Sequence, residues 1–285
     1  MITLNNLAEN QNMKVIAEKG IYTVFEHQKD MSVSPEYASV AYFMHEMNVR
    51  KRQVLCRMNN SAVKLQAGAM QWTAGQVDSS TGVKGVGDFL GKALKGAVTS
   101  ESAVKPLYQG SGFLMLEPTY RYIILEDVSR WGSGIVLDDG LFLACDACLQ
   151  EKIIARSNAS SALLGGEGLF NLSLSGSGIA VLESPVPREE LIEIVVQDDV
   201  VKIDGNMAIA WSNTLQFTVE KSSKSLMGSA LNGEGFVNVY RGSGKILLAP
   251  TVNGTTMSPA NGPKTSNTTS SKGLVSSVVK SALDL

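Results

Sequence analysis

Three glutamates recur at matching places in the sequence, and they are the acidic residues with the clearest case for a shared chemical role. Each stands between two small residues and precedes an alternating run, a Gly-Ser-Gly triplet, an apolar run and a proline; they are Glu101, Glu167 and Glu234. Carboxylates at equivalent positions could hold a ligand, or they could cap backbone amides at a turn, which need hydrogen-bond partners when they are buried. Amide capping is the simpler role, and ligand binding stays open.

Histidine and cysteine, which supply most metal ligands and many enzyme nucleophiles, are scarce in this chain. The two histidines, His27 and His45, cannot form a cluster of several imidazoles around a metal. Cys145 and Cys148 form a single Cys-x-x-Cys pair, whereas a structural zinc site needs further ligands. There is no Gly-x-Ser-x-Gly elbow, and a catalytic triad would have to use one of the two histidines. We therefore predict no catalytic residue, no metal site and no cofactor.

Closely spaced glycines raise the question of a phosphate-binding loop. Such a loop requires Gly-x-x-x-x-Gly-Lys-Ser/Thr between a strand and a helix. In the nearest stretch, five residues separate Gly85 from Gly91, and Ala93 stands where a hydroxyl is needed. Glycines at turns that need a positive φ explain the pattern better.

One short basic cluster, Arg50, Lys51 and Arg52, is the candidate contact for an anionic partner. No aromatic residues interleave with it, as they do in sites for single-stranded nucleic acid. The whole chain has 25 basic and 27 acidic residues, a net charge of −2, and so lacks the basic footprint of a dedicated nucleic-acid binder. A solvated turn is the favoured interpretation, and binding of nucleic acid is not expected.

The composition predicts a globular cytoplasmic protein. Hydrophobic residues make up 44% of the 285 residues, enough for a substantial core. No apolar run reaches the ~18 residues of a membrane span, and no signal or transit peptide is recognised at the N-terminus. Three cysteines are too few for a disulfide framework and fit a reducing compartment.

The elements that would position these residues are strands, and they form an internal repeat. The Gly-Ser-Gly triplets begin at residues 110, 176 and 242, an equal spacing of 66 residues. Each unit also has an alternating strand, a polar turn and a glycine that leads into another strand; these glycines are Gly68, Gly140 and Gly205. An Asp-Gly pair after an apolar strand is a strong hairpin signal. The pattern predicts three repeats of short antiparallel strands over about 37–250, with turns at the Gly-Ser-Gly triplets.

Segments outside the repeated strands complete the predicted organisation. A leading strand or hairpin is expected in 13–33, and a helix with an apolar stripe in 83–98. Beyond Pro250 the chain is rich in Ser, Thr, Asn, Pro and Gly, which is typical of a linker, and a short amphipathic helix ends the sequence. We therefore divide the chain into a β domain, 1–250, and a tail, 251–285.

The order of these motifs resembles the AIM24 (DUF124) family over about 37–250. The resemblance lies in the threefold order of glutamate, alternating run, Gly-x-Gly, apolar run and proline, and in the stretch GDFLGKALKGAVTSES before the first triplet. It implies an all-β fold, an antiparallel sandwich of the double-stranded β-helix type seen in TRAP-like proteins, with three internal repeats. Family members are mostly uncharacterised, and the eukaryotic relatives are linked to mitochondrial organisation.

These observations together predict a non-enzymatic oligomeric scaffold or interaction protein. The alternative is a protein that binds RNA or a small ligand on the same TRAP-like fold. A net charge near zero offers little repulsion against self-association. The expected partners are further copies of the chain, and the tail 251–285 is a candidate contact for another protein.

Overall fold

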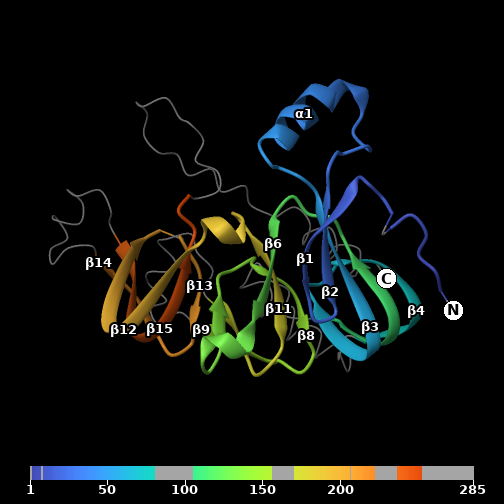
Figure 1. Ribbon diagram of the computed structural model, residues 1–285. Coiled ribbons are helices and arrows are strands. Elements are labelled where there is room, and N and C mark those ends of the chain that lie inside the picture. Colours follow the sequence, from blue (N-terminus) through green and yellow to red (C-terminus); the bar gives the residue numbers. More distant parts are fainter. Residues whose placement is uncertain are drawn as a thin grey trace, which may run out of the picture. The chain divides into compact units, whose positions relative to one another are not determined.

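The computed structural model describes residues 2–7, 9–80, 105–155, 170–205, 207–221 and 236–251. Met1–Val252 form one compact unit, and a second unit, Asn253–Leu285, lies outside the described residues. The described chain consists mainly of antiparallel strands with a single α-helix, which confirms the predicted all-β class (Figure 1). The helices predicted at 83–98 and at the C-terminus also lie outside the described residues.

The elements follow one another as a leading segment and three strand repeats. The leading segment contains β1 (Met13–Lys19), β2 (Tyr22–His27), η1 (Pro35–Tyr37) and α1 (Ala38–Glu46). The first repeat contains β3 (Arg52–Leu65), β4 (Met70–Ser80) and β5 (Leu107–Leu116). The second contains β6 (Tyr122–Asp127), η2 (Val128–Trp131), β7 (Ile135–Leu137), β8 (Phe142–Asp146), β9 (Gln150–Ala155), β10 (Phe170–Ser175) and β11 (Ile179–Ser184). The third contains η3 (Arg188–Glu190), β12 (Ile192–Asp204), β13 (Ala208–Ser212), β14 (Gln216–Lys221) and β15 (Phe236–Leu248).

The strands in the described part of the chain form two antiparallel sheets, and the second repeat is divided between them. One sheet has eight strands in the order β1-β2-β3-β8-β11-β6, with β5 paired to β3 and β4 paired to β5. The other has seven strands in the order β12-β15-β13-β7-β10-β9, with β14 paired to β15. Part of the second repeat thus extends the sheet of the first repeat, and the remainder extends the sheet of the third (Figure 1).

The Gly-Ser-Gly triplets occupy two kinds of environment. The middle triplet, 176–178, is a turn that carries the chain from β10 in one sheet to β11 in the other. The first and third, 110–112 and 242–244, lie inside the long strands β5 and β15, so the predicted turns are wrong there. At these two places the partner strand bulges, with two residues of β3 or β12 opposite the single serine.

The serine of each of these two triplets lets its long strand continue, because its hydroxyl accepts a hydrogen bond from the bulged backbone of the partner strand. The bulged residues Asn60 and Asp198 both have a positive φ. The backbone N–H of Asn60 donates to Ser111 Oγ, and that of Asp198 donates to Ser243 Oγ, each over 2.9 Å. Each bulge is thereby accommodated without ending either strand.

Gly110 of β5 lies close against the backbone of β4, the other neighbour of β5. Its φ is +135°, and a Cβ would overlap the carbonyl oxygen of Gln76. We expect Gly110→Ala to lower the free energy of unfolding by about 3 kcal/mol, the sum of backbone strain and overpacking. In the control Gly68→Ala, φ is also positive (+83°) but the space is open, so only the ~1–2 kcal/mol of backbone strain is expected. Denaturant midpoints measure both losses, and equal losses would contradict the steric account.

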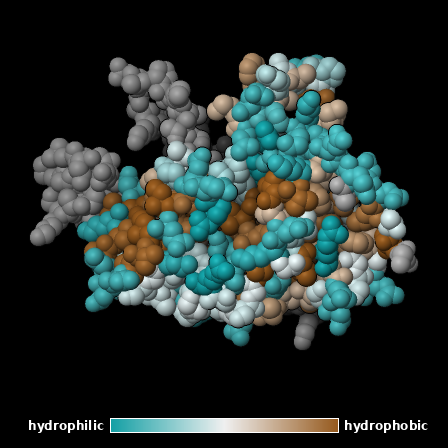
Figure 2. Space-filling model, viewed as in Figure 1, coloured by the Kyte–Doolittle hydropathy of each residue, from teal (hydrophilic) through white to brown (hydrophobic). Residues whose placement is uncertain are grey.

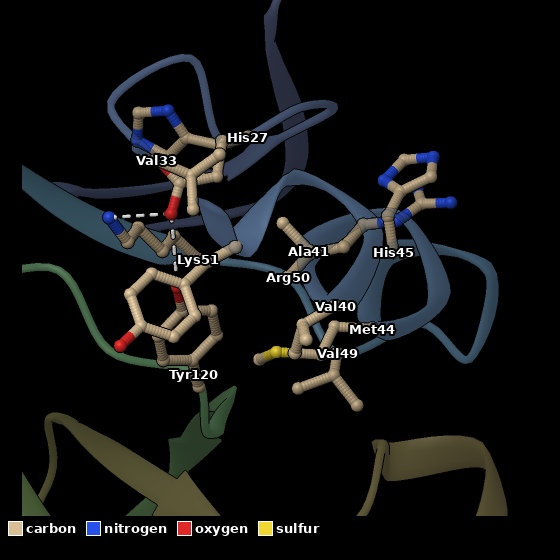
Figure 3. A pocket seen from close by; sticks show the side chains of 12 residues that line it. His27, Val33, Val40, Ala41, Met44, His45, Val49, Arg50, Lys51 and Tyr120 are labelled. Atoms are coloured by element: carbon tan, nitrogen blue, oxygen red, sulfur yellow. Dashed lines mark hydrogen bonds and ion pairs between the residues drawn. The ribbon is translucent and has the colours of Figure 1, made fainter. Parts of the chain in front are cut away.

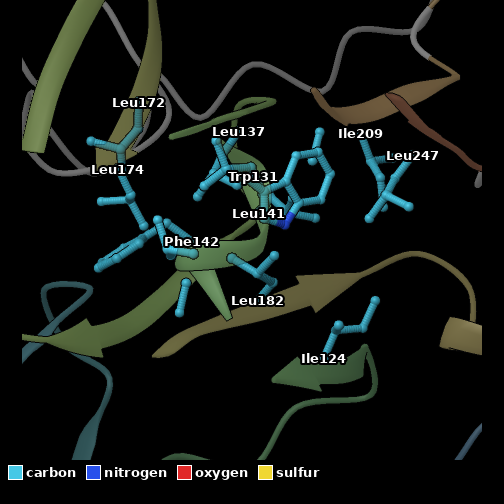
Figure 4. Packing of buried hydrophobic residues seen from close by; sticks show 14 of the residues in the cluster. Ile124, Trp131, Leu137, Leu141, Phe142, Leu172, Leu174, Leu182, Ile209 and Leu247 are labelled. Carbon is cyan, nitrogen blue, oxygen red and sulfur yellow. The ribbon is translucent and has the colours of Figure 1, made fainter. Parts of the chain in front are cut away.

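The largest core cluster packs the second repeat against the third. It contains buried residues from β6, β8 and β11 of one sheet and from β7, β10, β13 and β15 of the other. Trp131 lies among them, close to Leu137 and Leu141 in Figure 4. One further cluster joins the first repeat to β6, β8 and β11 within the first sheet, and another joins the third repeat to Val136 of β7 within the other sheet. The shared cluster is therefore the apolar contact that holds the two sheets together.

The helix α1 was not predicted, and it moves the start of the repeats. The sequence places the first repeat at about residue 37, whereas 38–46 are helical and the first repeated strand begins at Arg52. The predicted leading hairpin is confirmed, with β1 and β2 paired antiparallel. Helical period is hard to recognise in α1 because its apolar residues surround the axis and do not form one stripe.

Candidate functional site at the α1 helix

The helix α1 presents apolar side chains to solvent on a short and exposed element. It stands off the sheets in Figure 1, and none of its residues is buried. Tyr42 and Phe43 are 60% and 66% exposed, and Met47, at its end, is 75% exposed. We define the α1 surface by the exposed apolar side chains of this region, Met31, Tyr37, Val40, Tyr42, Phe43, Met47 and Val49. Helices this short are marginal in water, and helices that are apolar all round are normally buried.

A pocket of about 230 Å³ lies beneath α1 (Figure 3). Val40, Ala41 and Met44 form its apolar wall on the helix side. Lys51 and Tyr120 line the side away from the helix, close to the carboxylate of Asp30. The pocket is thus apolar toward α1 and charged toward the sheet.

Asp30 is the centre of the charged side of this pocket. Its carboxylate is 2.8 Å from Lys51 Nζ, and it accepts hydrogen bonds from Ser32 Oγ at 2.6 Å and Tyr120 Oη at 3.0 Å. The Lys51 and Ser32 contacts hold the pKa of the Asp30 carboxyl well below its usual value, and Asp30 in turn raises the pKa of Lys51. These contacts fasten the segment before α1 to the start of β3 and to the β5–β6 connection.

Arg52 and Glu26 form a buried ion pair next to this cluster. Arg52 is 1% exposed, and its Nη2 lies 2.7 Å from Glu26 Oε2. The same guanidinium donates to the carbonyl oxygens of Asn48 and Arg50 and stacks 4.0 Å from the ring centre of Tyr122. Arg50 Nη1 contacts the other oxygen of Glu26 at 3.0 Å. The Arg52–Glu26 pair therefore joins β2, the segment between α1 and β3, and the start of β6.

The structure brings Arg50, Lys51 and Arg52 together, each beside a carboxylate. Glu26 and Asp30 offset much of their charge, and the burial of Arg52 keeps its guanidinium from solvent. Because these ion pairs offset the positive charge, the cluster is a weaker contact for phosphate groups. RNA binding by it stays the alternative hypothesis. The repeated glutamates Glu101, Glu167 and Glu234 lie outside the described residues, so their roles stay predictions too.

The histidines and cysteines of the sequence do not converge in the described structure. His27 Nε2 is 2.8 Å from Gln53 Oε1, and His45 belongs to α1. The Cys148 thiol is exposed in the turn after β8 and donates to the Ser177 carbonyl at 3.3 Å, whereas Cys145 is buried in β8. Within the described residues no group of three or more histidines, cysteines or carboxylates is placed to hold a metal.

Thiol labelling of the folded chain should separate the three cysteines. Burial raises the pKa of Cys145 to about 12, and it also raises that of Cys56. We therefore expect one fast equivalent of reaction with a thiol reagent at neutral pH, from the exposed Cys148. Cys148→Ser should abolish the fast phase, and any fast equivalent that remains in that variant would contradict the buried positions of Cys56 and Cys145.

A second, open groove of about 700 Å³ runs beside β1, β6 and η3. It is lined by Lys19, Arg52, Arg130, Arg188 and Lys245 and by Glu18, Glu26, Glu126, Glu189 and Glu193, among others. Arg188 pairs with both Glu126 and Glu193, at 3.3 and 3.2 Å. Residues of both charge signs line the groove, so it offers no extended field of one sign for a strongly charged ligand.

Comparison with known proteins adds a family and a fold. Residues 46–251 match the family described as mitochondrial biogenesis AIM24. The chain is 30% identical over 198 residues to an uncharacterized protein of Streptococcus pyogenes serotype M6, covering 67% of this chain and 77% of that protein. It also resembles the crystal structure of a protein from Streptococcus pyogenes, with 26% identity and a TM-score of 0.53 over 72% of this chain and 90% of that one. No helix in the described ranges is long and apolar enough to cross a membrane.

Proposed function

Because this chain belongs to the AIM24 family, we propose that it is a non-enzymatic scaffold that associates with further copies of itself. The observation that carries the proposal is the α1 surface, where large apolar side chains face solvent on a helix without buried residues. Contiguous exposed apolar surface on a folded chain marks contact sites. Burial of this surface between copies would give α1 the packing that a nine-residue helix needs in order to persist.

A second copy is the occupant that best fits the chemistry of the α1 surface. Apolar side chains can pair with the same residues of another copy about a twofold axis, because an isologous contact needs only a self-complementary patch. The net charge of −2 adds little repulsion between copies. No complementary charge pattern is required, and Arg50 and Lys51, the basic residues that follow α1, are already paired with Glu26 and Asp30.

The two carboxylates at and beside the pocket, Asp30 and Glu26, support a role without catalysis. Asp30 is engaged by Lys51 and Tyr120, and Glu26 is engaged by Arg50 and Arg52. A general acid or base must be free to exchange a proton with a substrate. Groups held in mutual ion pairs are suited to fixing the loop that carries α1.

Light scattering on the full chain tests this proposal. We expect a mass above that of one chain, and we expect Tyr42→Ser/Phe43→Ser to lower it with little change in thermal stability, because both side chains are exposed. The control Val15→Thr/Ile16→Thr changes two exposed apolar residues of β1 and should leave the mass unchanged. An equal mass for the α1 variant and the wild type would remove α1 from the interface.

A further inference from the structure

Consecutive repeats are joined twice by the same strand pairing in the same register. In the first junction the end of β3 pairs with β8 of the next repeat, and in the second junction β7 pairs with β13 of the next repeat. In the first junction Val63 faces Asp146, Lys64 faces Cys145 and Leu65 faces Ala144. In the second junction Ile135 faces Ser212, Val136 faces Trp211 and Leu137 faces Ala210.

Backbone hydrogen bonds on either side show that the two junctions are equivalent. The N–H of Gln66 donates to Leu143 O at 2.8 Å, and the N–H of Asp138 donates to Ile209 O at 2.9 Å. On the other side, Ala147 N donates to Ala62 O and Asn213 N to Gly134 O, both at 3.0 Å. We call the first half of a junction the outgoing edge (63–65 and 135–137) and the second half the incoming edge (144–146 and 210–212).

The third repeat has an outgoing edge of its own. β12 pairs with β15 as β3 pairs with β5, with the same two-residue bulge, and Val201 faces Tyr240 as Val63 faces Tyr108. Residues 201–203 are therefore the counterpart of 63–65. Lys202 stands where Lys64 stands, and Lys64 is compatible with a junction because its Nζ donates to Leu149 O at 3.0 Å across it.

The first repeat has an incoming edge of its own. β4 pairs with β5 through a one-residue bulge, after which Trp72 faces Met115. β13 pairs with β15 through the same bulge, after which Ala210 faces Leu247. Residues 72–74 are therefore the counterpart of 210–212 and of 144–146.

Both of these edges are unoccupied by any strand that the structure describes. β12 pairs only with β15, and β4 only with β5, among the described strands. Thr73 and Lys202 are exposed, whereas Cys145, Trp211 and Val136 at the equivalent places are buried. Val195 and Val200 of β12 are 60% and 44% exposed, and Figure 2 shows hydrophobic surface where β12 lies in Figure 1. Long exposed edges of this kind favour the addition of a strand.

We propose that the outgoing edge of β12 pairs with the incoming edge of β4 in a second copy of the chain. The register of the two internal junctions places Val201 opposite Ala74, Lys202 opposite Thr73 and Ile203 opposite Trp72 of the second copy. Contacts of this head-to-tail kind continue from copy to copy, as a ring where the rotation closes and as a filament where it does not. The proposal specifies the self-association proposed above and rests on it, but it uses a surface distinct from α1.

Disulfide trapping in the full chain tests the register directly. The background is Cys148→Ser, which removes the exposed native thiol. Lys202→Cys/Thr73→Cys changes two exposed residues whose Cα atoms would lie about 5.5 Å apart across the junction, within the range of a disulfide. Mild oxidation should give a ladder of covalent dimers, trimers and longer species on a non-reducing gel. The control Lys202→Cys/Gln76→Cys moves one thiol three residues along β4, about 10 Å, and should stay a single-chain band.

The outcomes separate this interface from the proposed function. A ladder from the matched pair alone supports the junction. No ladder, or equal ladders from both pairs, overturns it, and thermal unfolding of the reduced variants confirms that they are folded. If light scattering still shows oligomers without a ladder, the scaffold stands and this interface falls. A single-chain mass overturns both.

Discussion

Replacing Arg52 with methionine is expected to lower the free energy of unfolding by about 3–5 kcal/mol. The substitution keeps an unbranched side chain in the site but leaves the buried Glu26 carboxylate without its closest cation. Removal of one partner from a buried ion pair is costly because the remaining charge stays desolvated. The variant also loses the hydrogen bonds to the carbonyls of Asn48 and Arg50 and the stacking on Tyr122. Urea unfolding at neutral pH measures the loss.

Two companion variants locate the origin of that effect. Arg50→Met removes the other cation that contacts Glu26. Because the Arg50 side chain is 24% exposed, its loss should lower the free energy of unfolding by only about 1 kcal/mol or less. Glu26→Gln/Arg52→Met removes the stranded charge as well and should recover part of the stability that Arg52→Met loses. Equal losses for the Arg50 and Arg52 single variants would contradict the special role of the buried pair.

Replacing Trp131 with alanine should be of similar size, about 3–5 kcal/mol, because it empties the core that joins the two sheets. Trp131 is 2% exposed and packs in the cluster that both sheets share (Figure 4). Its indole N–H donates to Glu126 at 3.2 Å, and Lys245 Nζ lies 4.7 Å from the ring centre. The indole thus contacts the second repeat through Glu126 and the third through Lys245.

The variant Trp131→Phe separates the volume of this side chain from its polar contact. It keeps an aromatic ring in the core but removes the hydrogen bond to Glu126, and we expect it to cost about 1–2 kcal/mol. Thermal and denaturant unfolding of both variants measures the difference. Near-equal stability of Trp131→Ala and the wild type would contradict a core in which Trp131 connects the sheets.

The strand repeats could be predicted because their signals are local. Alternation of side chains and turn glycines are read from neighbouring residues, and the 66-residue spacing shows which segments are equivalent. The division of the second repeat between two sheets could not be predicted. In the second repeat, a longer segment that contains η2 stands where β3 and β12 have a bulge, and it separates β6 from β7. The 66-residue spacing does not indicate which sheet β6 and β7 each join.

The candidate site was less predictable because it depends on contacts between distant residues. The basic cluster at 50–52 is visible in the sequence, but its pairing with Glu26 and Asp30 joins segments about twenty residues or more apart. α1 was missed because its apolar residues lack one-sided periodicity. Helices that are apolar on all sides are normally buried, and for this reason the composition of α1 supports the proposed self-association.

Sedimentation velocity of the full chain over a wide range of concentration tests most directly whether this protein is a self-associating scaffold. We predict species larger than one chain, with a mass that rises with concentration and falls in Tyr42→Ser/Phe43→Ser. The control Val15→Thr/Ile16→Thr should sediment as the wild type does. A single-chain mass at every concentration would contradict the proposed function and the head-to-tail junction together.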